Sequence, residues 1–332
     1  MADELADDLA ERMRMVAWER EEHIGAAQRR LQELQELRFG RLGGPPVCVR
    51  ELREQPLEAL EPAWRALRKG RRVHVESEPG ACPGVFRILR ERASLLGEGM
   101  LSVCPPGERS EAHAQWQEIG VAPRSERVAL MQSDADPELA AYLLARGCLR
   151  RTGFDPRVVH RVIVVGALDR LLRNLRRLWV GARMGPVEDG RAFAGPVDET
   201  RAEAYLACEQ RWRAEPGVTT ICQGNRLQVA GAPEARFLAP ALFRVPSYDA
   251  DAELPSPGPA PIGPMLIVHP VGSGPGARER GEQLLAELGA QGRGHLRFGT
   301  KPRELRLRKI DSQVHGALLV ERLPPGLPEP RP

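Results

Sequence analysis

The sequence predicts an α/β fold built on parallel sheets, and three observations lead to this prediction. Short apolar runs alternate with amphipathic runs between Val47 and Cys104, an order typical of parallel strands joined by right-handed crossovers. Val158–Val165 is apolar and β-branched apart from two residues, which is the pattern of a strand covered on both faces. Hydrophobic residues make up 42% of the chain and aromatic residues only 5%, so we expect a core of Leu, Val and Ala.

Residues 1–44 are predicted to form an N-terminal amphipathic helical segment. Leu5, Leu9 and Met13 recur at helical spacing within Ala2–Leu37 and make one apolar stripe. Acidic residues share the polar face, which favours packing on the same chain or on a partner subunit over binding to a membrane surface. The Gly- and Pro-rich run at 40–46 ends the segment.

Residues 45–126 are predicted to form a truncated Rossmann-like unit. Strands at Val47–Arg50, Arg72–Val75 and Met100–Cys104 alternate with helices at Leu57–Leu67 and Gly84–Leu96. No GxGxxG follows the first strand, and GxxxxGK[ST] occurs nowhere in the chain, so the usual phosphate-binding loops are absent from this unit. The polar, weakly patterned residues 104–127 are interpreted as a linker or domain crossing.

Residues 127–322 are predicted to form a second α/β domain centred on Leu149–Val165. In that stretch the turn residues Gly153–Pro156 precede the buried strand, with a helix at Pro137–Cys148 before it and another at Leu168–Val180 after it. Further along we expect helices at 199–215, 278–288 and 303–313, strands at 219–222, 227–229, 241–245, 265–268, 295–298 and 317–321, a mobile loop at 249–264, and a disordered Pro-rich tail at 323–332.

Charge, hydropathy and cysteine usage narrow the functional classes. The net charge of +3 is too small to indicate nucleic acid by itself, and no aromatic residues interleave with the arginines of Leu168–Val180 to stack bases. No run approaches the ~20 apolar residues of a membrane span, and the acidic N-terminus lacks an apolar signal core. The six cysteines show no CxxC spacing and no clustered histidine. We therefore expect reduced thiols in a cytoplasmic protein, with no metal site, no membrane association and no nucleic-acid partner.

Several segments, in the same order along the chain, resemble the aldehyde dehydrogenase superfamily. The run GARMGPVEDGRAFAGPVD at 181–198 resembles the family's "G.P.d....GP.i" segment, and FLAPALFRVP at 237–246 is similar to its "f..PtlL..v" strand. LEALEPAWRALRKGRRVHVESEPG at 57–80 resembles the "a..pal.AL.aGN.vv.Kpse" region, and DADPELAAYLLARGCLRRTGFDPRVVHRVIV at 134–164 resembles the region around the family's catalytic cysteine. The matches are collinear over roughly residues 45 to 325. The resemblance implies an aldehyde dehydrogenase-like fold with a Rossmann-like cofactor domain and an α/β catalytic domain.

The resemblance also implies a chemistry, in which a Cys thiolate attacks an aldehyde and hydride passes to NAD or NADP. An Asn side chain and a backbone N–H stabilise the oxyanion, and a Glu acts as base. On this chain the nucleophile position falls on Pro156, the oxyanion Asn on Glu54, and the base on Glu118 as a loose remnant. The cofactor-binding positions fall on Glu76, where the family has Lys, and on Ala260, where it has Glu. No catalytic or cofactor-binding residue of the family is intact.

Two functional hypotheses follow. The favoured one is a non-catalytic pseudoenzyme without a cofactor, which acts as a binding, regulatory or scaffolding subunit in a homo-oligomer or in a hetero-oligomer with an active relative. The alternative is an NAD- or NADP-dependent oxidoreductase that oxidises an aldehyde through a displaced nucleophile, Cys148 or Cys104. Two other residues near the turn have structural interpretations: His160 as a core or interface histidine, and Asp155 as an exposed turn residue that hydrogen-bonds the backbone.

Overall fold

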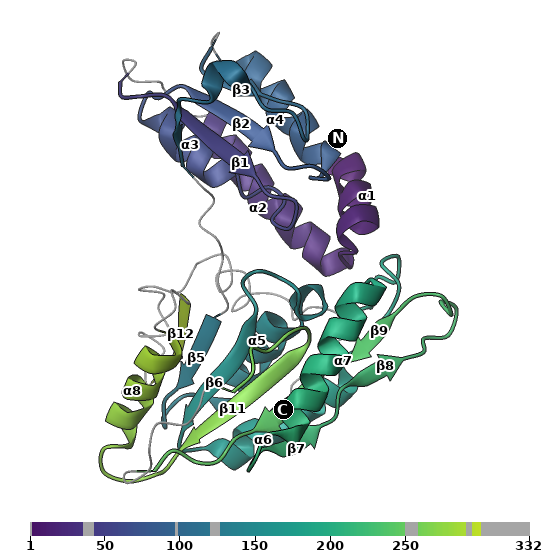
Figure 1. Cartoon of the computed structure of the whole chain (residues 1–332), viewed down its shortest axis with the longest axis vertical. Helices are drawn as coiled ribbons and strands as arrows, with labels where there is room; N and C mark the ends of the chain where they lie inside the picture. The colour runs from purple at the N-terminus through teal and green to yellow at the C-terminus, as the bar shows by residue number, and fades with distance from the viewer. Residues whose placement is uncertain are drawn as a thin grey trace. The chain divides into compact units, whose positions relative to one another are not determined.

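The computed structural model describes residues 2–35, 43–96, 99–119, 127–249, 258–289 and 294–299 (Figure 1). The chain divides into two compact units, one of Met1–Met15 with Glu19–Arg124 and one of Val16–Trp18 with Ser125–Pro332. Four predicted features lie outside the described residues: the helix at 303–313, the strand at 317–321, the tail at 323–332 and the 250–257 part of the mobile loop. No helix in the described ranges is long and apolar enough to cross a membrane.

A four-stranded parallel sheet with strand order β3-β2-β1-β4 forms the centre of the first unit. The chain moves outward from β1 to β3 and then returns to the other side of β1 with β4, a reversal of direction typical of Rossmann-like units. The elements of this half of the chain are α1 (Ala2–Met13), α2 (Ala17–Gln35), β1 (Val47–Glu51), α3 (Leu60–Arg68), β2 (Val73–Ser77), α4 (Pro83–Leu95), β3 (Leu101–Val103), η1 (Glu111–His113) and β4 (Gln117–Glu118).

The two faces of this sheet differ in chemistry because side chains alternate along each strand. Val47 and Val73, which are paired in register, point to the face that forms a core with apolar residues of α1, α3 and α4. Their neighbours Cys48 and His74 are also paired in register and therefore lie on the opposite face. The α-helices of the described residues thus pack on one face, and polar side chains gather on the other, where His113 of η1 stacks on His74.

The interpretation of residues 104–127 as a linker is wrong in its central part. Gln117 and Glu118 form β4, which pairs parallel to Val47 and Cys48 of β1. Both β4 side chains are exposed and polar, so the strand has no apolar pattern to mark it. Backbone pairing with the open edge of β1 defines this strand.

A six-stranded sheet with order β12-β5-β6-β11-β10-β7 forms the second unit, and only β7 is antiparallel to its neighbour in the described residues. A separate two-stranded sheet pairs β8 with β9. The elements are β5 (Arg127–Met131), α5 (Pro137–Leu149), η2 (Arg150–Gly153), β6 (Val159–Val165), α6 (Leu168–Gly181), α7 (Glu199–Ala214), β7 (Thr219–Cys222), β8 (Asn225–Leu227), β9 (Phe237–Ala239), β10 (Ala241–Arg244), β11 (Met265–Val271), α8 (Ala277–Gly289) and β12 (Gly294–Phe298).

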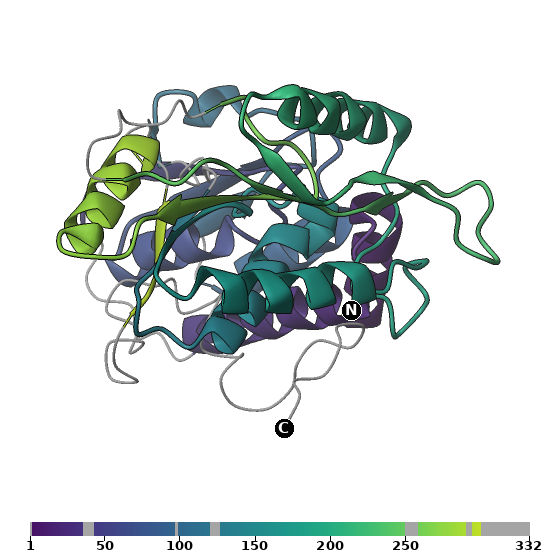
Figure 2. The same ribbon diagram turned by 90° about the horizontal axis from the view of Figure 1, so that it is seen from below.

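Helices cover both faces of this second sheet. Alternate residues of β6 and β11, such as Val162 and Val268, face the core formed with α5 and α6. Residues of the other set, such as Ile163 and Ile267, face α8 and α7. Figure 2 shows α6 in teal and α7 in green on opposite sides of the strands.

The predicted α/β architecture is confirmed, and so is the buried strand at its centre. Every residue of β6 is buried, which explains its nearly continuous apolar sequence. The preceding helix α5 begins where Asp136 accepts hydrogen bonds from the N–H groups of Glu138 and Leu139. One short strand was misplaced: residues 227–229 were predicted as a strand, whereas β8 ends at Leu227 and pairs with β9.

Candidate functional site

A cavity of about 390 Å³ lies at the carboxyl edge of the first sheet. Parallel α/β sheets bind ligands outside the carboxyl ends of their strands, where the strand order reverses, and here the order reverses at β1. The cavity is therefore placed where such a fold carries a ligand. The charged residues that line it are Arg50, Arg53, Arg109, Glu76, Glu78 and Glu108.

Strands β1 and β2 and the loops that follow the strands supply the charges of this cavity, and β4 places one more charge beside it. Arg50 of β1 is in register with Glu76 of β2 and lies 3.4 Å from Glu118 of β4. The Glu118 side chain is about half exposed, so this ion pair contributes at most about 1 kcal/mol. Glu78 accepts a hydrogen bond from the backbone N–H of Arg53 at 2.9 Å. The structure thus brings together two of the predicted site positions, Glu76 and Glu118, on either side of Arg50.

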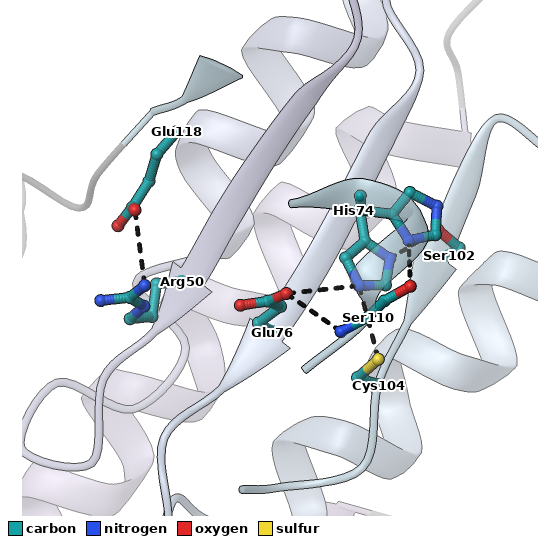
Figure 3. Close-up of polar contacts among 8 residues, drawn as sticks. Arg50, His74, Glu76, Ser102, Cys104, Ser110 and Glu118 are labelled. Atoms are coloured by element: carbon teal, nitrogen blue, oxygen red, sulfur yellow. Dashed lines mark hydrogen bonds and ion pairs between the residues drawn. The ribbon is translucent and has the colours of Figure 1, made fainter. Parts of the chain in front are cut away.

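The polar face of the same sheet carries a cluster centred on His74 (Figure 3). Ser102 Oγ shares a hydrogen bond with His74 Nδ1 at 2.7 Å, and Cys104 Sγ shares one with His74 Nε2 at 3.4 Å. Glu76 Oε1 lies 4.0 Å from the same Nε2 and accepts a hydrogen bond from the Ser110 N–H at 3.4 Å. These side chains meet because β2 and β3 are parallel and in register, so that alternate residues project from one face.

The environment of this cluster does not activate its thiol. Burial, together with the negative charges of Glu76 and Glu108, raises the pKa of Cys104. Burial and the neighbouring His113 lower the pKa of His74, against the opposing effect of Glu76. His113 stacks on His74 with a ring-centroid separation of 3.8 Å. A neutral imidazole beside a protonated thiol is the expected state near pH 7, whereas nucleophilic cysteines need a lowered pKa.

A buried carboxylate occupies the space where the first crossover helix begins. Glu51 at the end of β1 accepts hydrogen bonds from the N–H groups of Leu57 at 2.6 Å and Ala59 at 3.0 Å. In dinucleotide-binding folds the amides at this place face a pyrophosphate. In this chain the amides at that place donate their hydrogen bonds to Glu51 instead. Burial raises the pKa of Glu51 to about 8, in spite of the two backbone hydrogen bonds.

In the second unit, the turn at the predicted nucleophile position has a left-handed backbone. Arg151 and Thr152 have φ values of 48° and 54°, and Gly153 has a φ of 78°. A Cβ on Gly153 would lie 2.1 Å from the carbonyl carbon of Gly263, so only glycine fits there. Pro156 follows, half-buried, two residues before the strand-forming run.

Asp155, beside Pro156, does not occupy the exposed position that we expected. Its side chain is only 3% exposed and lies 3.4 Å from the Arg150 guanidinium and 3.6 Å from that of Arg157. The expected backbone hydrogen bond is present, because the Arg157 N–H donates to Asp155 Oδ1 at 2.8 Å. Burial raises the pKa of this carboxyl, but Arg157, Arg150 and Arg151 outweigh it and hold the pKa well below its usual range. Arginines close to Asp155 in the sequence thus explain how a charged turn residue can be buried.

The other candidate residues of this unit are placed as follows. Cys148 is fully buried in α5, and burial raises the pKa of its thiol. His160 Nε2 lies 2.9 Å from the Gly263 carbonyl oxygen, which agrees with the interpretation of His160 as a core histidine. Ala260 is exposed, and its carbonyl oxygen accepts a hydrogen bond from the Cys208 thiol at 3.2 Å.

Glu54, the remaining candidate, lies in the first unit in the turn that follows β1. Its carboxylate is 3.9 Å from the Arg53 guanidinium. Across all the described ranges, no three His, Cys, Asp or Glu side chains are grouped so that they could hold a metal ion.

Sequence reasoning missed the His74 cluster and the arginines of the cavity. A signal was present, since Cys48, Arg50, His74 and Glu76 occupy the polar positions of alternating strands. The alternation indicates a shared face, but which residues meet across strands depends on register. Register is decided by the packed sheet and not by the pattern within one strand.

No family model and no curated protein matches the sequence. Solved structures do match the fold. Methylmalonate-semialdehyde dehydrogenase from Oceanimonas doudoroffii has 15% identity and a TM-score of 0.66, over 92% of this chain and 71% of that one. Lactaldehyde dehydrogenase from Escherichia coli has 13% identity and a TM-score of 0.62, over 89% and 74%. A mutant of aldehyde dehydrogenase C from Pseudomonas syringae, in complex with NAD+ and octanal, has 14% identity and a TM-score of 0.60, over 88% and 72%. The similarity to these structures extends over most of the chain and includes both units. This chain therefore has the aldehyde dehydrogenase fold.

Proposed function

We propose that this protein is a non-catalytic aldehyde dehydrogenase-like protein of the cytoplasm that acts as a binding, regulatory or scaffolding subunit. The observation that carries the proposal is the turn at the nucleophile position, where Pro156 follows the buried, arginine-paired Asp155. Proline has no side-chain nucleophile, and a carboxylate held between guanidiniums is a poor one. Cys148, the nearest cysteine along the chain, is fully buried.

The first sheet adds a second line of support, because its residues do not fit the phosphates of NAD or NADP. Three carboxylates, those of Glu76, Glu78 and Glu108, line the cavity at its carboxyl edge and offset the charge of its three arginines, and the amides at the start of the crossover helix bind Glu51. A pyrophosphate at this edge would meet the Glu51 carboxyl group where dinucleotide sites present free N–H groups. The chain would act in an oligomer, either with a second copy of itself or with an active relative that supplies the catalysis.

The test combines activity with cofactor binding. Purified protein is incubated with a panel of aliphatic and aromatic aldehydes and either NAD+ or NADP+, and reduced cofactor is followed by absorbance. Thermal unfolding is followed with and without each cofactor, since a ligand at about 100 times its Kd adds about 2.7 kcal/mol to the stability of the fold. We expect neither turnover nor a shift in Tm. Turnover that Cys104→Ser or Cys148→Ser abolishes would overturn the proposal.

One contact favours a second function, aldehyde oxidation with NAD or NADP through a displaced cysteine. Cys104 Sγ lies 3.4 Å from His74 Nε2, and a thiol beside an imidazole is a common nucleophilic pair. Limiting iodoacetamide at pH 7, with mass spectrometry of the labelled peptides, separates the two functions. Cys222 is the matched control, because it is also half-buried and its pKa is also raised by burial. Labelling of Cys104 many times faster than Cys222 would favour the second function, and similar slow rates favour the first.

A further inference from the structure

A second cavity, of about 460 Å³, lies within the second unit, outside the carboxyl ends of β6, β10 and β11. Its lining includes Gly166 and Ala167 after β6, Arg244 at the end of β10, and Gly272 and Ser273 after β11. The volume is in the range of pockets that hold small organic ligands. The family's catalytic and cofactor positions lie outside the lining of this cavity, which contains none of Glu54, Glu76, Glu118, Pro156 and Ala260.

The topology of the sheet places this cavity at a point where the chain changes direction. From β6 the chain enters α6, which packs on one face of the sheet. From β11 it enters α8, which packs on the other face and leads to β12 at the far edge. Neighbouring parallel strands whose following helices lie on opposite faces leave a crevice between the two loops, and this crevice is the usual ligand site of open α/β sheets.

The loop after β11 has the sequence of a phosphate-binding turn. Residues 272–277 read G-S-G-P-G-A, which matches G-x-G-x-x-A between a parallel strand and a helix. Gly274 has a φ of 134°, a conformation open to glycine but not to other residues. A Cβ on Gly272 would lie 2.1 Å from Asp249 Oδ1, so a larger residue there would displace the Asp249 carboxylate. The motif follows β11, a late strand of the chain, and not the first strand.

Two guanidiniums supply positive charge to the cavity. Arg170 and Arg244 line it, and no ion pair to either is found within the described residues. Arg280 of α8 donates hydrogen bonds to the carbonyl oxygens of Gly272 and Pro275 and so holds the loop in place. The cavity also borders the start of α6, whose first-turn N–H groups have no partners within the helix and whose N-cap, Ala167, provides no side-chain cap.

One carboxylate lines the cavity and a second lies beside the lining. Asp169 lines it, and Asp249 lies against Gly272 and accepts a hydrogen bond from Ser247 at 3.2 Å. A ligand with one anionic group and adjacent hydroxyl groups would fit these charges. Its anionic group would bind the arginines, and its hydroxyl groups would donate hydrogen bonds to the carboxylates. Two guanidiniums, serine hydroxyls and helix-start amides are the groups that bind phosphate.

We propose that this cavity binds the phosphate group of a small hydroxylated molecule such as a sugar phosphate. The inference concerns residues 166–170, 244–249 and 270–277 only and holds whether or not the chain is a catalyst. The probes are ribose 5-phosphate and inorganic phosphate, with ribose and acetate at equal ionic strength as controls for the sugar and for a carboxylate anion. Binding is measured by the shift in Tm and by line broadening of the phosphorus-31 NMR signal.

Four variants of the full chain make the test specific. Arg244→Gln and Arg170→Gln each remove one guanidinium and are expected to weaken ribose 5-phosphate binding at least tenfold. Ser273→Asp, at an exposed loop position, adds a negative charge to the lining and is expected to abolish binding. Arg173→Gln, exposed on the same α6 helix but outside the lining, is the matched control and should bind as the parent does.

The outcomes separate clearly. Binding of both phosphate probes, lost in the lining variants and kept in Arg173→Gln, supports the proposal. Absence of any phosphorus signal change at millimolar probe concentration in the parent protein would overturn it. Equal binding by the parent, Arg244→Gln and Ser273→Asp would also overturn it, since the phosphate would then bind elsewhere. Circular dichroism of each variant establishes that loss of binding is not loss of the fold.

Discussion

The Glu51→Gln substitution is expected to remove a pH dependence from the stability of the first unit. Burial raises the pKa of Glu51 from 4.5 to about 8 in the folded protein. A group whose folded pKa is raised stabilises the fold fully below its unfolded pKa, and this contribution is lost as the pH rises through the folded pKa. The parent protein should therefore lose stability steadily between pH 4.5 and pH 8.

The magnitude follows from the same values. One pKa unit corresponds to about 1.4 kcal/mol, so ionising Glu51 across this range costs the folded state roughly 4 kcal/mol. Glutamine cannot ionise, but its amide can accept only one of the two hydrogen bonds from the Leu57 and Ala59 N–H groups. The backbone N–H group that loses its acceptor lowers the free energy of unfolding by about 1–3 kcal/mol at every pH. The variant should be less stable than the parent at pH 5 and at least equal to it at pH 8.

Urea unfolding at pH 5, 6.5 and 8 tests this, with hydrogen exchange of the β1 and α3 amides to report on the first unit. Glu91→Gln, an exposed carboxyl on α4, is the control and should follow the parent curve. Parallel stability curves for the parent and Glu51→Gln between pH 5 and 8 would refute the reasoning, because they would show that Glu51 takes up no proton in this range.

Three other substitutions test the second unit. Gly153→Ala should destabilise the fold by several kcal/mol, since it combines a φ of 78° with a 2.1 Å approach to Gly263; a variant with the parent Tm would contradict this placement of the turn. Asp155→Asn should cost about 3–5 kcal/mol at pH 7, because it leaves buried guanidiniums without their carboxylate. The contribution of Asp155 should be complete above pH 3.8 and should decrease progressively as the pH falls from 3.8 toward its lowered folded pKa. Urea unfolding at pH 7 measures the full contribution, and unfolding at pH 3 measures the beginning of its loss. Equal stabilities of parent and variant at pH 7 would count against the buried pair. His269→Met should keep or raise the Tm at pH 7 and reduce the loss of stability below pH 6.5. The buried His269 imidazole has no hydrogen-bond partner in the described part of the chain. Burial and the neighbouring Arg161 lower its pKa to about 3. A large drop in Tm of the variant at pH 7 would show that the imidazole has a partner.

Local sequence chemistry was sufficient for most elements of the fold. The β-branched run at 158–165 predicts a buried strand in an α/β core, and β6 is buried along its whole length. Helix starts such as Asp136 before α5 follow from the side chain that caps them. The two-residue strand β4 could not be found in this way, because its exposed side chains carry no pattern and its pairing depends on the edge of β1.

The candidate sites depended far more on contacts between distant segments. That Pro156 lies in a turn is a property of neighbouring residues, but the burial of Asp155 depends on how the left-handed backbone at Arg151 and Thr152 folds arginines around it. Sequence reasoning named Cys104 and Glu76 separately, and the register of β2 with β3 brought both to the His74 imidazole.

By itself, then, the chain's own chemistry determined the α/β class, the buried central strand, the turn that precedes it and the absence of a nucleophilic side chain at Pro156. These are properties of one residue or of one short run, where alternation, turn residues and side-chain type act locally. The two cavities, the His74 cluster and the phosphate-binding context of residues 272–277 were decided by tertiary structure. Each joins loops or strands that are far apart in the sequence, and only the order and register of the parallel strands determine which of them meet.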